Sequence, residues 1–536
     1  MLLSAALPSC QKEGPHRAQD HFEAERQDVV NAWLSLNLNV VSSGGVTKAA
    51  SEVVGGTNNG VNEEIIKRIA VYLVPLEGGS ENWNECIMTY AHGLSMSSGS
   101  THTIAVKAKM NVPMNVYVGA NLSTKLAEAI LDDGPDAAFS SSATSYRELM
   151  NEFVSEEEGI AMMCTRPYSV TFIEENANSS TPAEVDGGDA VDLIRMLAKV
   201  HVLFQCYDSP NDEFVKITEP GSIDAAPFGK FGWSKLSDIS YIVNTVNKST
   251  KLYQPQYGGA YSDYRDLNHS MTSLLEKSLE WEYRSGAADK FLCFAEDLSL
   301  DHDAEWAQWS ATPERYDISK APFGSGSAYT NGLYCLENTT DDSALSEMTT
   351  DEKKYVPFMV STHIIVKARF VPRHIISGTD TVGDPVTTSF EVSKCSDAFD
   401  FLVEKTKAQD TRDENGNLID YPKGTFFTRD MKEFYSYDGM MAVINSKHYP
   451  RKSFAAYPGG YGFYYSYIYG GNDTSGRVTF TGSDSGVFRN HYHILSCQLM
   501  KVPATPGSYN QLMMVNSSVV DWNPKGALNL IVKPNV

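Results

Sequence analysis

The chain has 536 residues, enough for roughly two to four ordinary domains that each bury a core. Its 67 acidic and 44 basic residues give a formal net charge of -23, which repels phosphate backbones and argues against nucleic acid as a partner. Twenty-eight tyrosines and 23 phenylalanines, with abundant Gly, Ser, Thr and Asn, favour a mostly β protein.

The N-terminal residues carry a short apolar run that ends in Leu-Pro-Ser-Cys10. This pattern predicts the final part of a bacterial lipoprotein signal over residues 1–10, with the lipid on Cys10. The polar residues that follow predict a solvated tether. No segment reaches the roughly 18 to 20 consecutive apolar residues that a membrane-spanning helix needs.

Residues 31–40 read Asn-Ala-Trp-Leu-Ser-Leu-Asn-Leu-Asn-Val, and this alternation predicts a strand. Its inward-facing side chains are Leu34, Leu36, Leu38 and Val40. A loose Ser/Gly-rich stretch at 42–49 follows and is typical of an easily cut linker. We therefore interpret residues 11–48 as a tether, a removable strand and a linker. Removal of this strand would leave the rest of the fold short of one strand.

Further along the chain, a strand that stops at a proline is predicted at 64–75, and a strand pair at 101–109 and 114–120. Short helices are predicted after Ser123 and Ser145, because a serine can cap the first turn. Later strands are predicted at 192–206, 239–246, 355–370, 426–434, 461–469, 491–500 and 513–520, with a hairpin turn at Asn415 and Gly416.

The polar segment 176–189 predicts a domain boundary. We assign residues 49–188 to an N-terminal β-sandwich domain, residues 189–510 to a C-terminal one, and residues 511–536 to a C-terminal segment. The strand-like part of that segment either belongs to the chain's own sheet or pairs with another chain.

Eight cysteines stand without a CxxC pair or zinc-type spacing, and most lie in apolar runs. This distribution favours buried free thiols over a disulfide framework.

Candidate metal and catalytic residues are few. His491 and His493 share one face of a predicted strand, but no further ligands can be assigned, and alternate histidines on an exposed face are the favoured interpretation. Asp301 and Asp303 are interpreted in the same way, as part of a solvated loop. The stretch 413–417 lacks the glycine and the final glutamate of a calcium loop and favours a turn. We predict no metal and no cofactor.

Catalytic motifs are absent from the sequence: it contains no Gly-x-Ser-x-Gly elbow, HExxH pair or Walker loop, so an enzyme is not predicted. The aromatic stretch from Tyr457 to Tyr469 allows two interpretations, a sugar-binding platform or a core strand. The core strand is favoured.

Several motifs, in their order and spacing, resemble the Bacteroidales fimbrillin family of the Mfa/FimA type, and within it the shaft subunits of the minor fimbria. They are Cys10-Gln-Lys-Glu-Gly, the strand at 65–75 ending Val-Tyr-Leu-Val-Pro, Asn115-Val-Tyr-Val, the segment at 161–167, Arg195-Met-Leu-Ala-Lys-Val-His-Val, the strand at 362–370 and Gly486-Val-Phe-Arg-Asn-His-Tyr-His493. The resemblance covers nearly the whole chain and implies two transthyretin-like β-sandwich domains with a few short helices.

The resemblance also implies a maturation route. Such proteins are exported as outer-membrane lipoproteins, and a protease removes the first strand at the cell surface, after which the C-terminal strand of another subunit fills the open groove. Here the matching cut lies between Lys48 and Ala49, where the family usually has Arg. The implied partners are further copies of this chain, other fimbrial subunits, the maturation protease, the membrane lipid before cleavage, and a host protein or glycan.

The C-terminal tail supports this exchange independently of the family. Leu528, Leu530 and Val532 alternate on one face, nearly as Leu34 and its neighbours do. Because donor and groove are different surfaces, repeated exchange would build a filament. The open alternatives are a tip or anchor subunit, which would stay uncut at Lys48, and a carbohydrate-binding adhesive lipoprotein.

Overall fold

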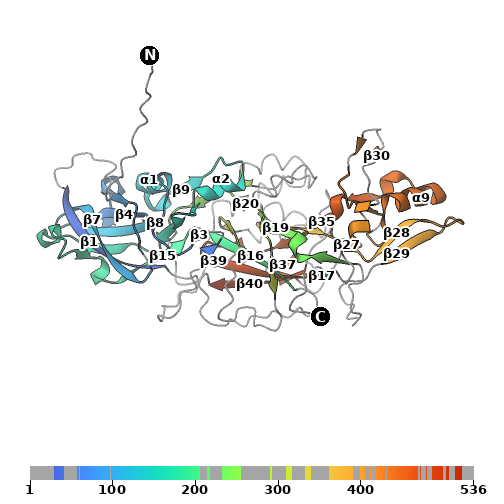
Figure 1. Cartoon of the computed structure of the whole chain (residues 1–536). Coiled ribbons are helices and arrows are strands. Elements are labelled where there is room, and N and C mark those ends of the chain that lie inside the picture. Colours follow the sequence, from blue (N-terminus) through green and yellow to red (C-terminus); the bar gives the residue numbers. More distant parts are fainter. Residues whose placement is uncertain are drawn as a thin grey trace, which may run out of the picture.

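The structure is a computed structural model. It describes residues 29–40, 57–58, 61–96, 98–205, 214–217, 232–254, 290–292, 310–316, 332–339, 361–389, 399–401, 403–404, 411–412, 418–419, 421–429, 431–468, 471–472, 478–479, 486–498, 502–505 and 514–521. Figure 1 shows three groups of strands following one another along the long axis of the molecule.

The first group is a sheet of ten strands among the described residues, in the order β14-β1-β15-β12-β8-β4-β5 with three strands attached at the side. Its members are β1 (Val29–Val40), β4 (Ile69–Glu77), β5 (Ser80–Glu81), β6 (Ile87–Ala91), β7 (Ser100–Lys109), β8 (Pro113–Ala120), β12 (Met162–Cys164), β13 (Tyr168–Thr171), β14 (Ala183–Glu184) and β15 (Ala190–Arg195). β4 is apolar in nearly every position and its residues from Ile69 to Pro75 are buried, as expected for a strand covered on both faces.

Two helices lie beside this sheet, α1 (Thr124–Asp133) and α2 (Tyr146–Asn151). Each begins at the serine that the sequence predicts as its cap: Ser123 Oγ accepts from Leu126 N at 3.4 Å, and Ser145 Oγ from Glu148 N at 3.3 Å. Short 3-10 turns complete the group: η1 (Trp83–Glu85), η2 (Gly134–Asp136), η3 (Glu174–Ala177) and η4 (Val185–Gly187).

The second group holds three small sheets. The first contains β16 (Ala198–Gln205), β23 (Glu314–Tyr316), β24 (Leu333–Cys335), β39 (His491–Gln498) and β40 (Met514–Asp521). The second contains β19 (Ile239–Asn244), β26 (His363–Arg369) and β35 (Tyr461–Tyr467). The third contains β17 (Phe214–Ile217), β18 (Gly232–Lys235) and β27 (Val371–Pro372), and η5 (Leu236–Asp238) precedes β19.

The third group lies at the end of the molecule farthest from β1 (Figure 1). Its sheet has the order β29 (Pro385–Ser389), β28 (His374–Thr379), β33 (Phe434–Tyr435), β32 (Phe426–Thr428) and β34 (Ala455–Tyr457). Helix α9 (Tyr437–Lys447) covers it, followed by η9 (Arg451–Ser453) and η10 (Pro458–Gly460). A small core of its own, which includes Phe427, Tyr435 and Met440, holds this group together.

The remaining described strands form short two-stranded pairs. They are β2 (Thr57–Asn58) with β3 (Val61–Asn62), β9 (Ala138–Ser140) with β21 (Ser249–Lys251), β10 (Val154–Ser155) with β11 (Gly159–Ile160), β20 (Val246–Asn247) with β22 (Phe291–Leu292), β25 (Asn338–Thr339) with β38 (Gly486–Val487), β30 (Thr411–Arg412) with β31 (Leu418–Ile419), and β36 (Gly471–Asn472) with β37 (Val478–Thr479). The pairing of β30 with β31 brackets the predicted hairpin turn at Asn415 and Gly416, which lies outside the described residues.

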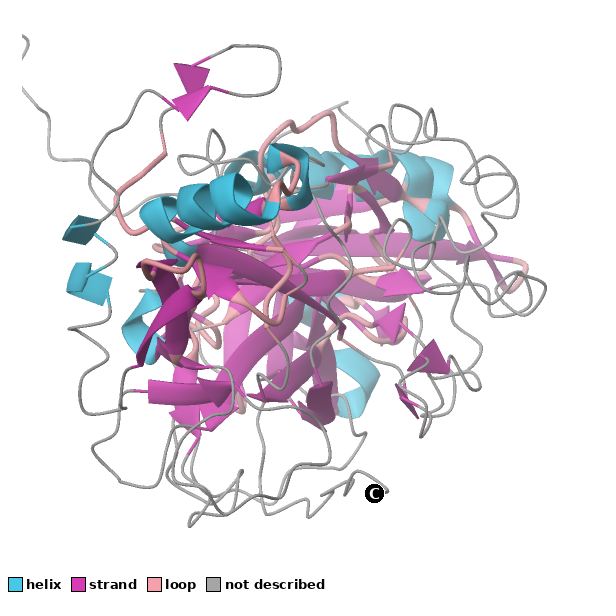
Figure 2. Ribbon diagram, turned by 90° about the vertical axis from the view of Figure 1, so that its right-hand side faces the viewer, coloured by secondary structure: helices cyan, strands magenta, loops and turns pink. Residues whose placement is uncertain are grey.

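The prediction of a mostly β protein of packed sheets with a few short helices is confirmed. Figure 2 shows the helices on the outside of the stacked strands. One continuous core of buried side chains runs from the first group into the second, from Leu36 through Leu197 to Tyr464. In the described part of the chain, no helix is long and apolar enough to cross a membrane.

The apolar run at 192–206 is not one strand, as the sequence predicts, but two. β15 ends at Arg195 in the first sheet, and β16 starts at Ala198 in the second group. Between them, Met196 N donates to Ala161 O at 2.9 Å and Leu197 O accepts from Asn490 N at 2.7 Å. The chain thus changes sheets at Met196 and Leu197, after the boundary that the sequence predicts at residue 188.

Candidate functional site

Strand β1 lies inside the first sheet and pairs on both edges. Along one edge it runs antiparallel to β7, from Val29 opposite Lys109 to Leu38 opposite Ser100. Along the other edge it runs parallel to β14 and then to β15. A strand in this position satisfies the backbone groups of three neighbours, and its loss would leave two open sheet edges facing one groove.

The inward face of β1 is buried from Ala32 to Val40, whereas Val30 at its start is 40% exposed. Leu34, Leu36 and Leu38 have no exposed surface, and Val40 is 3% exposed, as the alternation predicts. The sequence analysis missed a fifth inward side chain, Ala32, which is 1% exposed and continues the same two-residue period. Each buried leucine contributes roughly 1.5 to 3 kcal/mol by removing apolar surface from water.

The outward face of β1 is half-buried over most of its length, and its Asn39 side chain bonds to β15. Asn39 Nδ2 donates to Asp192 Oδ1 on β15 at 2.7 Å. Asp192 is itself held in place, because its backbone N donates to the Tyr168 hydroxyl at 2.7 Å and its carbonyl accepts from Thr165 N at 3.0 Å.

The C-terminal end of β1 is held by the chain that enters β7. Gly99 N donates to Leu38 O at 2.7 Å, and Val40 N donates to Ser98 Oγ at 3.0 Å. These two bonds attach the end of β1, up to Val40, to the segment before β7. The linker that the sequence predicts begins directly after Val40.

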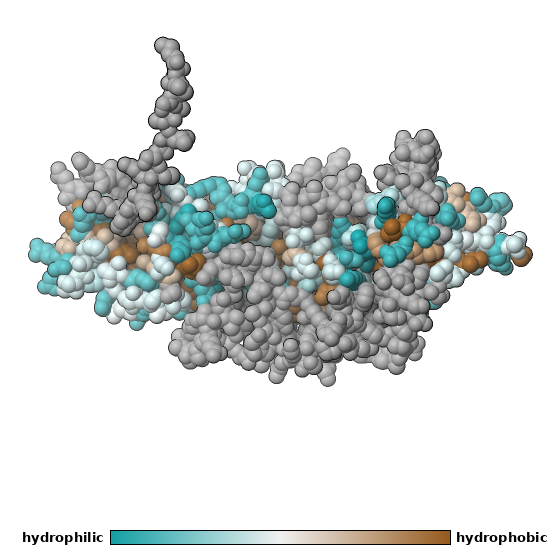
Figure 3. Space-filling model, viewed as in Figure 1, coloured by the Kyte–Doolittle hydropathy of each residue, from teal (hydrophilic) through white to brown (hydrophobic). Residues whose placement is uncertain are grey.

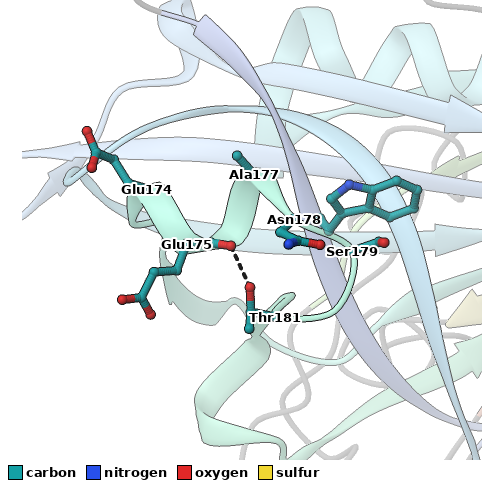
Figure 4. A pocket seen from close by; sticks show the side chains of 7 residues that line it. Glu174, Glu175, Ala177, Asn178, Ser179 and Thr181 are labelled. Atoms are coloured by element: carbon teal, nitrogen blue, oxygen red, sulfur yellow. Dashed lines mark hydrogen bonds between the residues drawn. The ribbon is translucent and has the colours of Figure 1, made fainter.

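A shallow hollow of about 610 Å³ opens on the outward face of β1. Trp33 and the residues around η3 line it, namely Glu174, Glu175, Ala177, Asn178, Ser179 and Thr181. Figure 4 shows that Asn178 and Ser179 lie on one side of this turn and the carboxylates of Glu174 and Glu175 on the other. The Asn176 side chain bonds to both ends of this turn: it accepts from Ile173 N at 2.8 Å and donates to Thr181 O at 2.9 Å.

A buried polar cluster joins the first group of strands to the second, and the sequence analysis did not identify it. Lys199 Nζ on β16 donates to Glu63 Oε1 at 2.9 Å, and the Tyr334 hydroxyl donates to the same oxygen at 2.6 Å. Arg195 Nε donates to Glu63 O at 3.2 Å, and Arg195 Nη1 donates to Asn490 Oδ1 at 3.4 Å. In the sequence, this cluster could have been recognised only from the charged residues that lie inside otherwise apolar runs.

A second buried ion pair lies nearby. Arg489 Nε donates to Glu337 Oε2 at 2.8 Å, and Thr250 Oγ1 donates to Glu337 Oε1 at 2.7 Å. Thr250 lies on β21, which pairs with β9, the short strand between α1 and α2. Arg195, Lys199, Arg489 and Asn490 all belong to the motifs that carry the family resemblance, so these motifs form the junction between the two groups of strands.

The two candidate metal-binding histidines lie on β39, between β16 and β40. The expectation of an exposed face is wrong, because His493 is 1% exposed and His491 is only partly exposed. Burial lowers the pKa of His491 to about 4 and that of His493 to about 3, so both are neutral at pH 7. Within the described ranges, no group of three or more His, Cys, Asp or Glu residues could hold a metal ion.

Several aromatic residues of the stretch from Tyr457 to Tyr469 lie in the core. Tyr457, Phe463 and Tyr464 are each at most 4% exposed, and Tyr457 stacks on Phe426 with ring centroids 4.7 Å apart. This confirms the core interpretation for these residues and removes them as a sugar-binding platform.

Four cysteines fall within the described residues, and all four are free thiols, as predicted. Cys164, Cys335 and Cys497 are buried, whereas Cys86 is partly exposed.

Other predicted site residues lie outside the described residues: Cys10, Lys48, Ala49, Leu528, Leu530, Val532, and the loop that holds Asp301 and Asp303. Of the predicted C-terminal segment, β40 pairs with β39 of the same chain. In this structure β40 therefore belongs to the chain's own sheet.

No protein-family model and no curated protein matches the sequence. Solved structures with a related arrangement include a fimbrilin from Porphyromonas gingivalis, at 12% identity and a TM-score of 0.38 over 92% of this chain and 99% of that one. The tip fimbrial protein Mfa3 of the same organism matches at 11% identity and a TM-score of 0.33, over 92% of this chain and 100% of that one.

A protein from Parabacteroides distasonis whose name assigns it to cell adhesion matches at 11% identity and a TM-score of 0.38, over 92% of this chain and 98% of that one. The chain thus has structural neighbours among fimbrial and cell adhesion proteins.

Proposed function

We propose that this chain is a structural subunit of a surface fimbrium, a member of the Bacteroidales fimbrillin family closest to the minor-fimbria shaft subunit. The proposal rests on its sequence motifs and above all on one structural observation. β1 is a central strand with five buried inward side chains, yet in sequence it stands alone before the linker and the rest of the fold.

In this proposal the chain is exported as an outer-membrane lipoprotein with lipid on Cys10. A protease then cuts between Lys48 and Ala49, and β1 leaves the sheet. The open edges of β7 and β15 and the spaces left by Leu34, Leu36 and Leu38 form a groove that another β-strand can fill.

The incoming strand is the C-terminal tail of another subunit, with Leu528, Leu530 and Val532 inward. The donor tail and the groove are different surfaces of one chain, so each added subunit offers a new groove and the contact repeats as a filament. The filament would mediate adhesion of the cell to a host protein or glycan. The role is structural, not catalytic.

Size measurement after a controlled cut tests this function. In the full chain, residues 44–49 are replaced by the recognition sequence of a site-specific protease, and light scattering follows the purified protein after cutting. We expect the uncut chain to stay monomeric and the cut chain to form a ladder of oligomers. A matched chain that lacks residues 526–536 should stay monomeric after the same cut, and if both cut chains stay monomeric the function is wrong.

N-terminal sequencing of protein purified from the cell surface separates a shaft subunit from a tip or anchor subunit. A shaft subunit should begin at Ala49. Material that is still joined to Cys10 would instead support an anchor role.

A further inference from the structure

Asp192 lies where it can select the register of the strand that replaces β1, by bonding to one residue of that strand. Its carboxylate faces the outward side of the groove and accepts from Asn39, and no other side chain of β1 is known to bond across to β15 in the described residues. Two backbone bonds keep Asp192 fixed when β1 is absent, because neither comes from β1. The departure of β1 would therefore leave a positioned carboxylate beside an empty strand position.

We propose that Asp192 binds Lys533 of a second copy of this chain and so sets the register of the incoming tail. This inference rests on the proposed function. With Leu528, Leu530 and Val532 in the places of Leu34, Leu36 and Leu38, the strand alternation puts Lys533 in the place of Asn39. The bond from the neutral amide of Asn39 to the Asp192 carboxylate is thereby replaced by an ion pair with the Lys533 ammonium.

Side-chain size supports the same register. It puts Gly526 in the place of Ala32, the smallest inward side chain, and Pro534 in the place of Val40 at the end of the strand. A proline is acceptable at a strand end, where its missing N–H gives up the bond that Val40 N donates to Ser98 Oγ.

The competing register moves the tail by two residues, so that Leu528, Leu530 and Val532 replace Leu36, Leu38 and Val40. The two segments match well in this register, because both read Leu-Asn-Leu-x-Val. However, it puts Gly526 where Leu34 is fully buried and leaves a leucine-sized cavity. It also puts Ile531 beside Asp192, which then loses its side-chain donor.

The reversed strand direction is disfavoured by the same reasoning. It would put Pro534 in the place of Ala32, which pairs with Val106 in the body of the β1–β7 ladder, and Gly526 in the place of Val40. The strand position that β1 occupies therefore favours a tail that runs in the direction of β1.

Substitutions at Asp192 and Lys533 test the charge contact in the cut full chain. In the wild-type groove, Lys533→Asp should slow oligomer formation about fivefold, because two carboxylates then face each other. In an Asp192→Asn groove, the same change should alter the rate less than about twofold. Asp192→Asn keeps a hydrogen-bonding group for Asn39 and so leaves the uncut chain folded.

Glu184 provides the matched control. It is exposed on the same edge of the groove, but it stands opposite Ser35 and away from Asn39. In a Glu184→Gln groove, Lys533→Asp should still slow assembly about fivefold. If Glu184→Gln removes the effect and Asp192→Asn does not, Asp192 is not the partner of Lys533.

Cysteine cross-linking reads the register directly. Thr101 lies on β7 opposite Asn37, on the solvent side. In the proposed register Ile531 takes the place of Asn37, so Thr101→Cys with Ile531→Cys should form an intermolecular disulfide. The matched control is Thr101→Cys with Asn529→Cys, on the same face of the strand. This pair should form an intermolecular disulfide only if the tail binds in the shifted register or in the reversed direction.

The outcomes separate the two proposals. A wild-type chain that fails to assemble after the cut contradicts the proposed function itself. The proposed function stands if the wild-type chain assembles after the cut. The proposed register is then wrong if the cysteine variants cross-link through Asn529→Cys, or if Lys533→Asp assembles as fast as the wild type.

Discussion

Lys199 and Glu63 form an ion pair in the interior of the protein, with 2.9 Å between Nζ and Oε1 and at most 7% of either side chain exposed. Lys199 lies on β16, whereas Glu63 directly follows β3 and precedes β4. The pair therefore holds the segment after the predicted cleavage linker against the second group of strands. Removal of β1 would leave this attachment intact.

We expect Lys199→Met to lower the free energy of unfolding by about 3 to 5 kcal/mol, because Glu63 would keep a buried charge without its cation. Urea unfolding of the uncut chain measures this change. The exposed pair of Lys125 and Glu152 is the control, and Lys125→Met should cost about 0 to 1 kcal/mol. Equal losses for the two variants would contradict a structural role for the buried pair.

The inward face of β1 should be essential for stability before cleavage. Leu36→Ala removes a fully buried side chain and should lower the free energy of unfolding by about 2 to 5 kcal/mol. Ser35→Ala, on the half-buried outward face, should change it by less than about 0.5 kcal/mol. Denaturant unfolding of both variants checks this, and a Leu36→Ala chain as stable as wild type would mean that β1 is not part of the core.

Acid should destabilise the protein through its buried histidines. Burial lowers the pKa of His363 to about 4, that of His491 to about 4 and that of His493 to about 3, against an ordinary value near 6.5. The unfolded chain therefore binds more protons than the folded chain below about pH 6.5, and stability is lost as the pH falls from there toward about 4. Thermal unfolding at a series of pH values measures the loss.

The variant His363→Asn should reduce this pH dependence, because it removes one of the three histidines. A wild-type melting temperature that does not change between pH 7 and pH 5 would show that these histidines are accessible to protons in the folded state.

Buried thiols should resist alkylation. Burial raises the pKa of Cys164 to about 12 and also raises those of Cys335 and Cys497 well above the ordinary value of a thiol, which suppresses the reactive thiolate. Mass spectrometry after iodoacetamide treatment at pH 8 should find these three unmodified in the folded chain and modified in denaturant. Modification of all three without denaturant would contradict the packing around them.

The sequence predicted β1 and its four inward side chains correctly because a strand with one buried face carries its own two-residue pattern. Ala32 escaped prediction because an alanine is a weak hydrophobic signal. The caps of α1 and α2 were predictable for a similar reason, since a capping serine acts on residues only three positions away.

The features that the sequence could not predict depend on residues far apart in the chain. The break at Met196 and Leu197 is set by Ala161 and Asn490, and no local pattern reports those contacts. The burial of His493 follows from the position of β39 between two other strands. Likewise, the contact of Asn39 with Asp192 spans 153 positions in the sequence.

In the part of the chain that the structure describes, exposed hydrophobic side chains do not mark a competing interaction surface. Figure 3 shows hydrophobic and hydrophilic residues mixed over the visible face. Among the described residues, the large hydrophobic side chains that are exposed are Val30, Ile173, Val382 and Val386. Single exposed residues of this kind are normal on a protein surface, so assembly is better sought in the groove of β1.

The central claim is that β1 is exchanged for the tail of another subunit, and the retention or release of the cut N-terminal fragment tests it most directly. Mass spectrometry of the site-specifically cut chain, separated by size, measures how much N-terminal fragment stays with monomers and with oligomers. If a tail replaces β1, the fragment should remain with the monomers, including those that lack residues 526–536, and one fragment should be released for each intersubunit contact formed. Oligomers that retain a full complement of the fragment would contradict the exchange of β1 for the tail of another subunit.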